Sequence, residues 1–371
     1  MKILYISNGS NFVSAGGMEY HLVDITNWLE SKGVETALAV RKGTYIQRNL
    51  LHDRPNVYPL SWTGFNKILS FFQMAKAIRE FAPDIISINR ERDIIRVFYV
   101  TKCMSLFLKK KPKIVSVFHN VGWKGSFSLE KLDGLLFPNN YIKQGYVPSG
   151  ARAENKSAVI YHGVHLIKVD PLLKLNPNRP RKYFKEIGFP LIGMVGELRK
   201  NQSELVDVAY HLKKRISDFT IAIVGRGTEE EVGMLKRKID SMGLAKNFII
   251  TGGIDRKHIP DIFYDLDISV TTNRSEPFGI VFIESLASYT PLIAYDSGGP
   301  VEVVEKGGGI LVKGGPEEMA EKMFMLLSDN GFRKSLAMAG RSAAEKYFSI
   351  DAMGEHHYNF YLNILKGNFE E

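Results

Sequence analysis

Short apolar runs alternate with longer helical patterns along the first half of the chain. Such runs predict strands, and between them apolar residues recur at the helical spacing. The predicted strands are 2–7, 35–40, 56–59, 84–88, 113–119, 134–137 and 158–161, and the helical patterns include 19–32, 67–80 and 94–109. Nearly continuous apolar strands separated by helices are typical of a parallel sheet that is covered on both faces. We therefore expect one doubly wound α/β domain in this half.

A break in the pattern precedes a second half of the same kind. From Asn176 to Pro190, polar residues and prolines replace the apolar periodicity, as in a linker. The alternation then resumes, with predicted strands at 191–195, 220–224, 247–251, 268–271, 292–294 and 309–311. Two helical segments, 331–348 and 352–365, follow the last strand. Two such domains place a cleft at the carboxyl ends of their strands, where parallel sheets bind ligands.

Composition excludes several classes of protein. The 371 residues suffice for two or three domains, and 44% apolar residues exclude fibrous and wholly disordered chains. A single cysteine, Cys103, permits neither an intramolecular disulfide nor a cysteine metal cluster, which favours a reducing cytoplasm. No apolar tract reaches the ~20 residues that span a bilayer, and the apolar start is too short for a signal peptide. We expect a cytoplasmic protein, soluble or peripheral.

The excess of positive over negative charge lies in the first half. Residues 1–170 hold 23 Lys and Arg against 13 Asp and Glu, a formal charge of +10, whereas residues 171–371 carry −1. A basic half can serve nucleic acid, an anionic membrane or an anionic substrate, or it can be a solvated surface without a ligand. Nucleic acid is disfavoured because no recognition motif accompanies the charge.

Glycine-rich turns follow three of the predicted strands. Gly16 and Gly17 precede a helix, where backbone N–H groups can approach an anion. In the second half, Arg199 and Lys200 stand in a similar turn and can neutralise a diphosphate. Gly225 opens a third turn that allows close backbone approach. Each turn alone has a simpler reading, a tight turn or a solvated charge.

The most informative segment runs from Glu276 to Glu284. Glu276 precedes a proline and is held in a loop, while the following Pro-Phe-Gly leads into a helix. We expect the N–H groups of Phe278, Gly279 and Ile280 to lack helical partners at such a helix start and to be available as donors. A loop carboxylate, these donors and the helix carboxylate Glu284 can together hold sugar hydroxyls and a phosphate. Either glutamate alone is more often a solvated charge or a partner of the helix dipole.

The stretch from Thr271 to Ala287, continuing to Glu302, resembles the E-x7-E signature of retaining glycosyltransferases of family 4, which have the GT-B fold. The resemblance extends over almost the whole chain, including the Gly-Gly turn at 16–17, His119 at the end of a strand and Gly225-Arg226-Gly227. It implies a GT-B architecture, two doubly wound Rossmann-like domains facing across a cleft. Residues 1–170, joined by the C-terminal helix at about 350–371, would bind the acceptor, and residues 171–349 the nucleotide sugar.

The resemblance also implies residue roles. The catalytic residues would be His119, Glu276, Arg199 and Lys200. Glu276 would bind hydroxyls of the donor hexose, and His119 would lie beside the reacting sugar. Arg199 and Lys200 would neutralise the departing diphosphate. The donor would also contact Gly16, Gly17, Gly225, Phe278, Gly279, Ile280 and Glu284, with Glu284 on the ribose hydroxyls.

Such enzymes move a hexose, with retention, from a nucleoside-diphosphate sugar to a glycan or lipid-linked acceptor. The resemblance implies a role in cell-surface polysaccharide or lipopolysaccharide biosynthesis, without a cofactor or metal. The triplet Asp265-Leu266-Asp267 looks like a metal-binding motif but falls at a helix-to-strand junction, so we interpret it as structural. Two alternatives stay open: a GT-B sugar-nucleotide epimerase, and a non-catalytic sugar-nucleotide-binding or assembly protein.

Two positions depart from the family pattern. Glu197 stands where the family has an arginine, and the loop is shortened so that Arg199 abuts Lys200; we infer that Arg199 takes the missing role. His162 replaces an asparagine, which we interpret as a turn variant.

Two stretches of the first half combine apolar and basic residues. One runs from Lys102 to Lys113, and the other holds Trp62, Phe65, Ile68, Leu69, Phe71 and Phe72 with Lys67 and Lys76. Amphipathic segments of this kind can lie on an anionic membrane, here the inner face of the cytoplasmic membrane. The alternative is that the apolar residues are core and the lysines cap helices.

Overall fold

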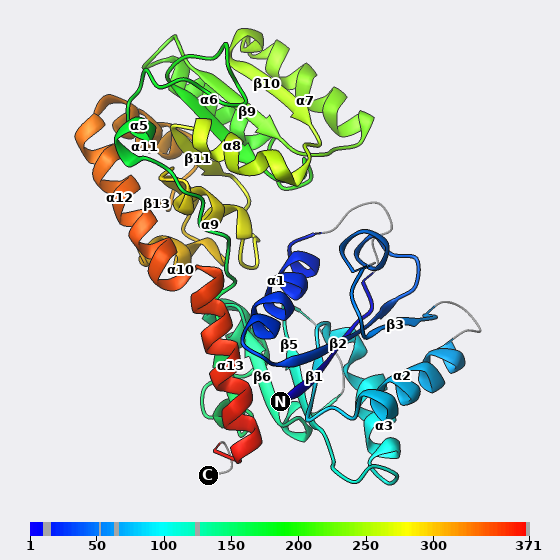
Figure 1. Ribbon diagram of the computed structural model, residues 1–371. Helices are drawn as coiled ribbons and strands as arrows, with labels where there is room; N and C mark the ends of the chain where they lie inside the picture. The colour runs from blue at the N-terminus through cyan, green and yellow to red at the C-terminus, as the bar shows by residue number, and fades with distance from the viewer. Residues whose placement is uncertain (10–15, 52, 63–66, 123–126, 369–371) are drawn as a thin grey trace. The chain divides into compact units, whose positions relative to one another are not determined.

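The chain forms two compact units in a computed structural model that describes residues 1–9, 16–51, 53–62, 67–122 and 127–368 (Figure 1). The first unit comprises Met1–Gly163 and Ile350–Glu371, and the second comprises Val164–Ser349. The first unit thus ends at Gly163 rather than at residue 170, because the following segment is bonded to the second unit. Val164 pairs with Ser349, and the Arg341 guanidinium donates to the Ile167 carbonyl oxygen at 3.0 Å.

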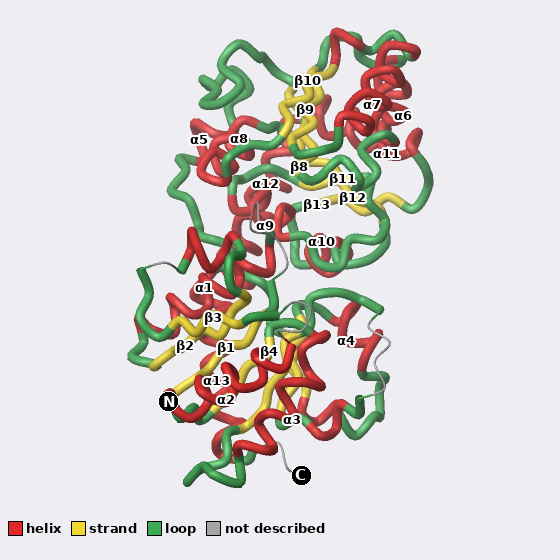
Figure 2. Tube along the Cα trace, turned by 90° about the vertical axis from the view of Figure 1, so that its right-hand side faces the viewer, coloured by secondary structure: helices red, strands yellow, loops and turns green. Residues whose placement is uncertain are grey.

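The first unit is built on a parallel sheet of seven strands in the order β3-β2-β1-β4-β5-β6-β7. Figure 2 labels β1, β2, β3 and β4 of this sheet. The strands are β1 (Lys2–Ser7), β2 (Glu35–Arg41), β3 (Val57–Leu60), β4 (Ile85–Ile88), β5 (Lys113–Val117), β6 (Gly134–Phe137) and β7 (Ser157–Val159). The helices are α1 (Gly17–Ser31), α2 (Lys67–Phe81), α3 (Ile94–Met104), α4 (Asn140–Tyr146) and α13 (Ile350–Lys366). The predicted doubly wound domain is confirmed.

Alternation along the strands divides the core of this unit into two layers. Leu4 and Ile6 of β1 pack with residues of α2 and α3, whereas Ile3 and Tyr5 pack with residues of α1 and α13. Both faces of each central strand are therefore buried, which is why these strands read as continuous apolar runs.

Helix α13 is seated in the first unit by close contacts along its length. A side chain at Gly354 would place its Cβ 2.1 Å from the Trp28 ring, so only glycine lets α13 approach α1. The Trp28 indole donates to Asp351 at 2.8 Å, and the hydroxyls of Tyr5 and Tyr361 lie 3.3 Å apart. The last helix of the chain thus completes the core of the first domain.

The second unit repeats the plan with six parallel strands in the order β10-β9-β8-β11-β12-β13. They are β8 (Leu191–Val195), β9 (Thr220–Val224), β10 (Phe248–Gly252), β11 (Ile268–Thr271), β12 (Leu292–Tyr295) and β13 (Gly309–Val312). The helices are α5 (Pro171–Lys174), α6 (Glu204–Lys213), α7 (Glu229–Ser241), α8 (Ile259–Asp265), α9 (Ile280–Ala287), α10 (Pro300–Glu305), α11 (Pro316–Ser328) and α12 (Asn330–Tyr347).

No helix in the described part of the chain is long and apolar enough to cross a bilayer.

The segment before β8 is held by buried charges. Asp267 binds the guanidinium groups of Arg179 and Arg181, each at 2.8 Å, and all three side chains are almost fully buried. Asp265 accepts hydrogen bonds from the backbone N–H groups of Lys182, Tyr183 and Phe184. Both carboxylates of the triplet 265–267 are therefore engaged within the protein, as the structural interpretation requires. Independence from metal stays a prediction.

Candidate functional site

In the second unit, two glycine turns meet in backbone contact at the carboxyl ends of β8 and β9. A Cβ at Gly225 would lie 1.8 Å from the carbonyl oxygen of Gly196, so no other residue fits. The Gly196 N–H donates to Val224 at 2.9 Å, and Leu198 N–H donates to Arg226 at 2.9 Å. The turn after β8 is thereby fixed against the turn after β9.

Lys200 and Glu276 form a salt bridge at the same edge. The Lys200 ammonium lies 2.8 Å from Glu276 Oε2, and the Asn273 amide donates to that oxygen at 3.0 Å. The Glu276 side chain is only 10% exposed, whereas that of Lys200 is 32% exposed. The structure thus brings together two of the predicted catalytic residues, an accessible cation and a fixed carboxylate.

Arg199 lies apart from this pair. Its side chain is 72% exposed, and its Nε lies 2.5 Å from a carboxylate oxygen of Glu197. The structure therefore places Lys200, and not Arg199, against Glu276. The inference that Arg199 substitutes for the usual family arginine stays a prediction.

The loop from Glu276 leads into α9 through a conformation that needs glycine. Gly279 is the N-cap residue with φ of 88°, and its Cβ would lie 2.1 Å from the Phe282 ring. No side chain caps the first turn of α9, so its N-terminal amides can serve an anion. Ile280 begins the helix, and Phe278 is buried before it. Glu284, one turn inside α9, pairs with Arg256 at 2.9 Å.

A polar cluster that the sequence analysis did not single out fixes the loop after β11. Arg274 donates to both carboxylate oxygens of Glu204 at 2.8 Å and lies over the Tyr295 ring, 3.5 Å from its centroid. The Tyr295 hydroxyl donates to Glu204 at 2.6 Å. Burial and the Glu204 carboxylate raise the pKa of Tyr295, so this hydroxyl stays a donor. The sequence did not indicate that these three residues are in contact, because they come from three different elements.

In the first unit, His119 lies at the carboxyl end of β5 within a cluster of four buried histidines. The others are His21 of α1, His162 after β7 and His357 of α13. Nδ1 of His21 and Nδ1 of His162 lie 3.0 Å apart, and the rings of His119 and His162 are stacked with centroids 5.3 Å apart. Nε2 of His119 bonds Oδ1 of Asn89 at 3.1 Å.

Burial keeps these imidazoles neutral. Desolvation lowers the pKa of His21 to about 4, and it holds the pKa of His119 well below its ordinary range, assisted by His21 and Arg90. If Nε2 of His119 donates to Asn89, Nδ1 of His119 is left as an acceptor, and it is buried with no partner among the described residues. The described residues include no group of histidines and acids that could hold a metal ion.

Sequence reasoning found His119, and it interpreted His162 as a turn variant. It missed His21 and His357, since one histidine on the apolar face of a helix gives no signal. Only the packing of α1 and α13 on the same face of the sheet brings them to His119.

Gly16 and Gly17 lie at the start of α1, as predicted from the turn. Gly16 N–H donates to Glu19 Oε2 at 3.0 Å, and Glu19 Oε1 in turn accepts from Arg90 at 2.8 Å. A carboxylate inside the first turn satisfies part of the helix N-terminus. The preceding Ser14 and Ala15 lie outside the described residues.

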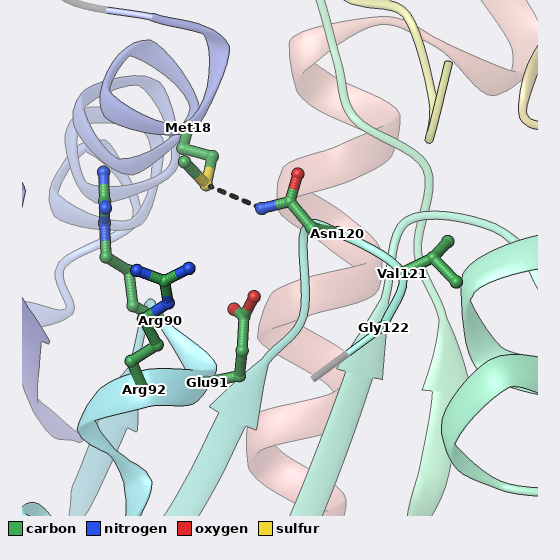
Figure 3. Close-up of a pocket in the computed structure, with 7 residues that line it drawn as sticks. All are labelled: Met18, Arg90, Glu91, Arg92, Asn120, Val121 and Gly122. Carbon is green, nitrogen blue, oxygen red and sulfur yellow. Dashed lines mark hydrogen bonds between the residues drawn. The ribbon is translucent and has the colours of Figure 1, made fainter. Parts of the chain in front are cut away.

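Two cavities open beside these elements in the first unit. The first, of about 420 Å³, is lined by Met18, Arg90, Glu91, Arg92, Asn120, Val121 and Gly122 (Figure 3). The second, of about 600 Å³, is lined by Asn8, Trp62, Phe71, Arg92, Asp93, Ile95, Arg96 and Tyr99. Arg92 lines both, so they are neighbours at the carboxyl ends of β1, β4 and β5.

Two family models match the chain and together span most of it. The model described as Glycosyltransferase Family 4 matches residues 15–168, and the model described as Glycosyl transferases group 1 matches residues 177–343. Among curated proteins, the sulfoquinovosyl transferase SQD2 of Arabidopsis thaliana is 24% identical over 220 residues, which is 58% of this chain and 42% of the plant protein. The chain therefore spans less than half the length of this relative.

Solved structures of glycosyltransferases share the fold. A glycosyltransferase from Rickettsia africae matches with a TM-score of 0.80 and 21% identity over 98% of each chain. HepE from Anabaena, solved in complex with UDP, matches with a TM-score of 0.77 and 19% identity over 97% of this chain and 99% of that one. HepE was also solved with UDP-glucose. These matches confirm the expected GT-B architecture of two Rossmann-like domains.

Proposed function

We propose, on the premise that the chain belongs to the glycosyltransferases of group 1 and family 4, that it moves a hexose from a nucleoside-diphosphate sugar to a glycan or lipid-linked acceptor. The observation that carries this proposal is the Lys200–Glu276 pair beside the uncapped N-terminus of α9. It joins a cation, a set of backbone donors and a fixed carboxylate at one edge of a parallel sheet.

This arrangement suits a sugar attached to a diphosphate. The N-terminal amides of α9, at Gly279 and Ile280, and the Lys200 ammonium would bind the phosphate oxygens. Glu276 would accept hydrogen bonds from hydroxyls of the hexose, and Glu284 from the ribose. The bound UDP of HepE, a protein of the same fold, supports a nucleotide-sugar donor.

The reaction we propose proceeds with retention of configuration. The bond from the anomeric carbon to the β-phosphate oxygen breaks, and the acceptor oxygen forms a bond to the same face of that carbon. The acceptor proton passes to the departing phosphate oxygen, whose negative charge Lys200 stabilises. The neutral His119 would hydrogen-bond the sugar rather than take the proton, because its pKa is well below its ordinary range.

We propose further that the protein acts in the cytoplasm on cell-surface polysaccharide or lipopolysaccharide precursors, with its first unit at an anionic membrane. Leu106 and Phe107 are 82% and 81% exposed and stand next to the lysines at 109–111. Exposed apolar side chains beside lysines suit an anionic lipid surface. Phe65 and the Lys67 side chain, also named in the sequence analysis, lie outside the described part. Flotation with anionic and with neutral vesicles tests this, and equal absence from both would contradict it.

The activity is tested by incubating the protein with UDP-, GDP- and ADP-hexoses and a pooled glycan acceptor. We expect release of one nucleoside diphosphate, strongly reduced in Glu276→Gln. Glu321→Gln, an exposed charge on α11 of the same unit, is the matched control and should leave release unchanged. An isomerised sugar without transfer would make the protein an epimerase, and binding without either product would make it a non-catalytic sugar-nucleotide-binding protein.

A further inference from the structure

Two arginines, Arg92 and Arg96, line the second cavity of the first unit. Neither Arg92 nor Arg96 forms a salt bridge with a carboxylate that the structure describes. Arg96 lies over the Trp62 ring, 5.1 Å from its centroid, and its Nη1 is buried without a hydrogen-bond partner among the described residues. Arg92 is exposed and is shared with the first cavity, where Figure 3 shows it beside Arg90. A buried guanidinium nitrogen without an acceptor is costly, so this place is suited to an anion.

The acids nearby offset the charge of this pair only in part. Glu19 is engaged with Arg90 at 2.8 Å. Asp93 accepts a hydrogen bond from Asn8 N–H at 3.0 Å, and burial raises its pKa to about 6 despite Arg90 and Arg96. Glu91 lines the first cavity, whereas Asp93 lines the second, where one carboxylate faces the two guanidinium groups of Arg92 and Arg96. An anion held by both Arg92 and Arg96 would therefore lie in the second cavity.

The same cavity opens beside an apolar surface. Tyr99 and Ile95 of α3 line it and are 57% and 42% exposed. Phe71 of α2 also lines it, and the neighbouring Ile68 and Phe72 on α2 are exposed. Helices α2 and α3 pack side by side (Figure 1). A basic pocket continuous with exposed aromatic and aliphatic side chains is complementary to a molecule with a charged head and an apolar chain.

We propose that this cavity binds the phosphate ester of an amphiphilic acceptor, with the phosphate between Arg92 and Arg96 and the lipid chain along α2 and α3. Guanidinium forks suit phosphate oxygens. The inference rests on the proposed function, because it names the class of acceptor that the enzyme glycosylates. It places the phosphate within the first unit, beside the Arg96–Trp62 contact.

The test measures binding of dodecyl phosphate to the full-length protein, below the micellar concentration of the probe, through tryptophan fluorescence, to which Trp62 contributes, and by calorimetry. Methyl phosphate and dodecyl maltoside are the probes that carry only the phosphate or only the chain. We expect dodecyl phosphate to bind at least about tenfold more tightly than either, and Arg96→Gln and Arg92→Gln each to weaken it by about tenfold or more. Arg79→Gln, an exposed arginine on α2 outside the cavity, is the matched control and should not change it.

Equal affinity for dodecyl phosphate and dodecyl maltoside would overturn the proposal, as would equal affinity for methyl phosphate. Unchanged affinity in both arginine variants would overturn it too. Circular dichroism and thermal unfolding of each variant separate loss of binding from loss of fold. The assay contains no donor, so a protein that binds dodecyl phosphate but releases no nucleotide would retain this site and refute the proposed function.

Discussion

Replacing Asp267 with asparagine tests whether the buried charges before β8 hold the second unit together. The Asp267 carboxylate accepts from Arg179, from Arg181 and from the backbone N–H of Leu191, each at 2.8 Å. Burial would raise the pKa of Asp267, but the two guanidinium groups outweigh it and hold the pKa below its ordinary value. The carboxylate is therefore ionised and binds two buried cations.

The asparagine removes the negative charge and turns one acceptor into a donor that faces N–H groups. Two guanidinium groups, 2% and 3% exposed, would then keep only carbonyl partners. Breaking a buried ion pair from one side costs about 3–5 kcal/mol. Because 1 kcal/mol shifts the midpoint of a unit of this size by about 2–4 °C, we expect a loss on the order of 10 °C.

Calorimetry and urea unfolding of the full chain measure this loss. Asp261→Asn is the matched control, because Asp261 pairs with Lys182 at 3.4 Å on the surface and both side chains are more than 40% exposed. An exposed pair contributes about 0–1 kcal/mol. A loss below about 1 kcal/mol in Asp267→Asn, equal to that of the control, would refute the structural role assigned to the triplet 265–267.

Three further predictions concern pH, loop contact and metal. His21 is protonated in the unfolded chain below pH ~6.5, but burial keeps it neutral in the folded chain until pH about 4. The free energy of unfolding therefore falls as pH drops between these values, by about 2 kcal/mol at pH 5. Urea unfolding should show a shallower pH dependence in His21→Gln, and a pH dependence identical to that of the unsubstituted protein would contradict this prediction. Gly225→Ala should displace Gly196 and weaken nucleoside-diphosphate binding, measured by calorimetry, at least about tenfold. Gly233→Ala on α7 is the control and should not weaken it. Equal affinities of the two variants for the nucleoside diphosphate would show that the turn does not shape the site. Chelator should leave transfer unchanged, and its loss with recovery in Mg²⁺ or Mn²⁺ would show that a metal is required.

The two sheets could be predicted because their strands are buried on both faces. Each strand reads as an apolar run, and the helices between them show one apolar face, so pattern alone identified both doubly wound domains. The predicted boundary between the two domains, at residue 170, was less accurate than the predicted sheets. The hydrogen bond from Arg341 to Ile167 and the pairing of Val164 with Ser349, which draw residues 164–170 into the second unit, join positions far apart in the sequence.

The contacts of the site could be predicted only where they lie within one motif. Within the segment 276–284, the sequence predicted a loop carboxylate, a helix start and a second carboxylate in this order. The salt bridge of Lys200 with Glu276, and the cluster of Glu204, Arg274 and Tyr295, depend on strands adjacent in the sheet but distant in the chain. Adjacent cations in a turn do not reveal which one turns inward, and the structure turns Lys200 toward the carboxylate and Arg199 toward solvent.

The measurement that tests the donor site most directly is a crystal structure of the protein with the nucleoside-diphosphate sugar that it binds best. We predict the diphosphate within hydrogen-bond distance of the backbone N–H groups of Gly279 and Ile280 and of the Lys200 ammonium, with the hexose hydroxyls on Glu276. A nucleotide bound elsewhere, for example between Arg92 and Arg96 in the first unit, with the start of α9 left without phosphate, would contradict the account.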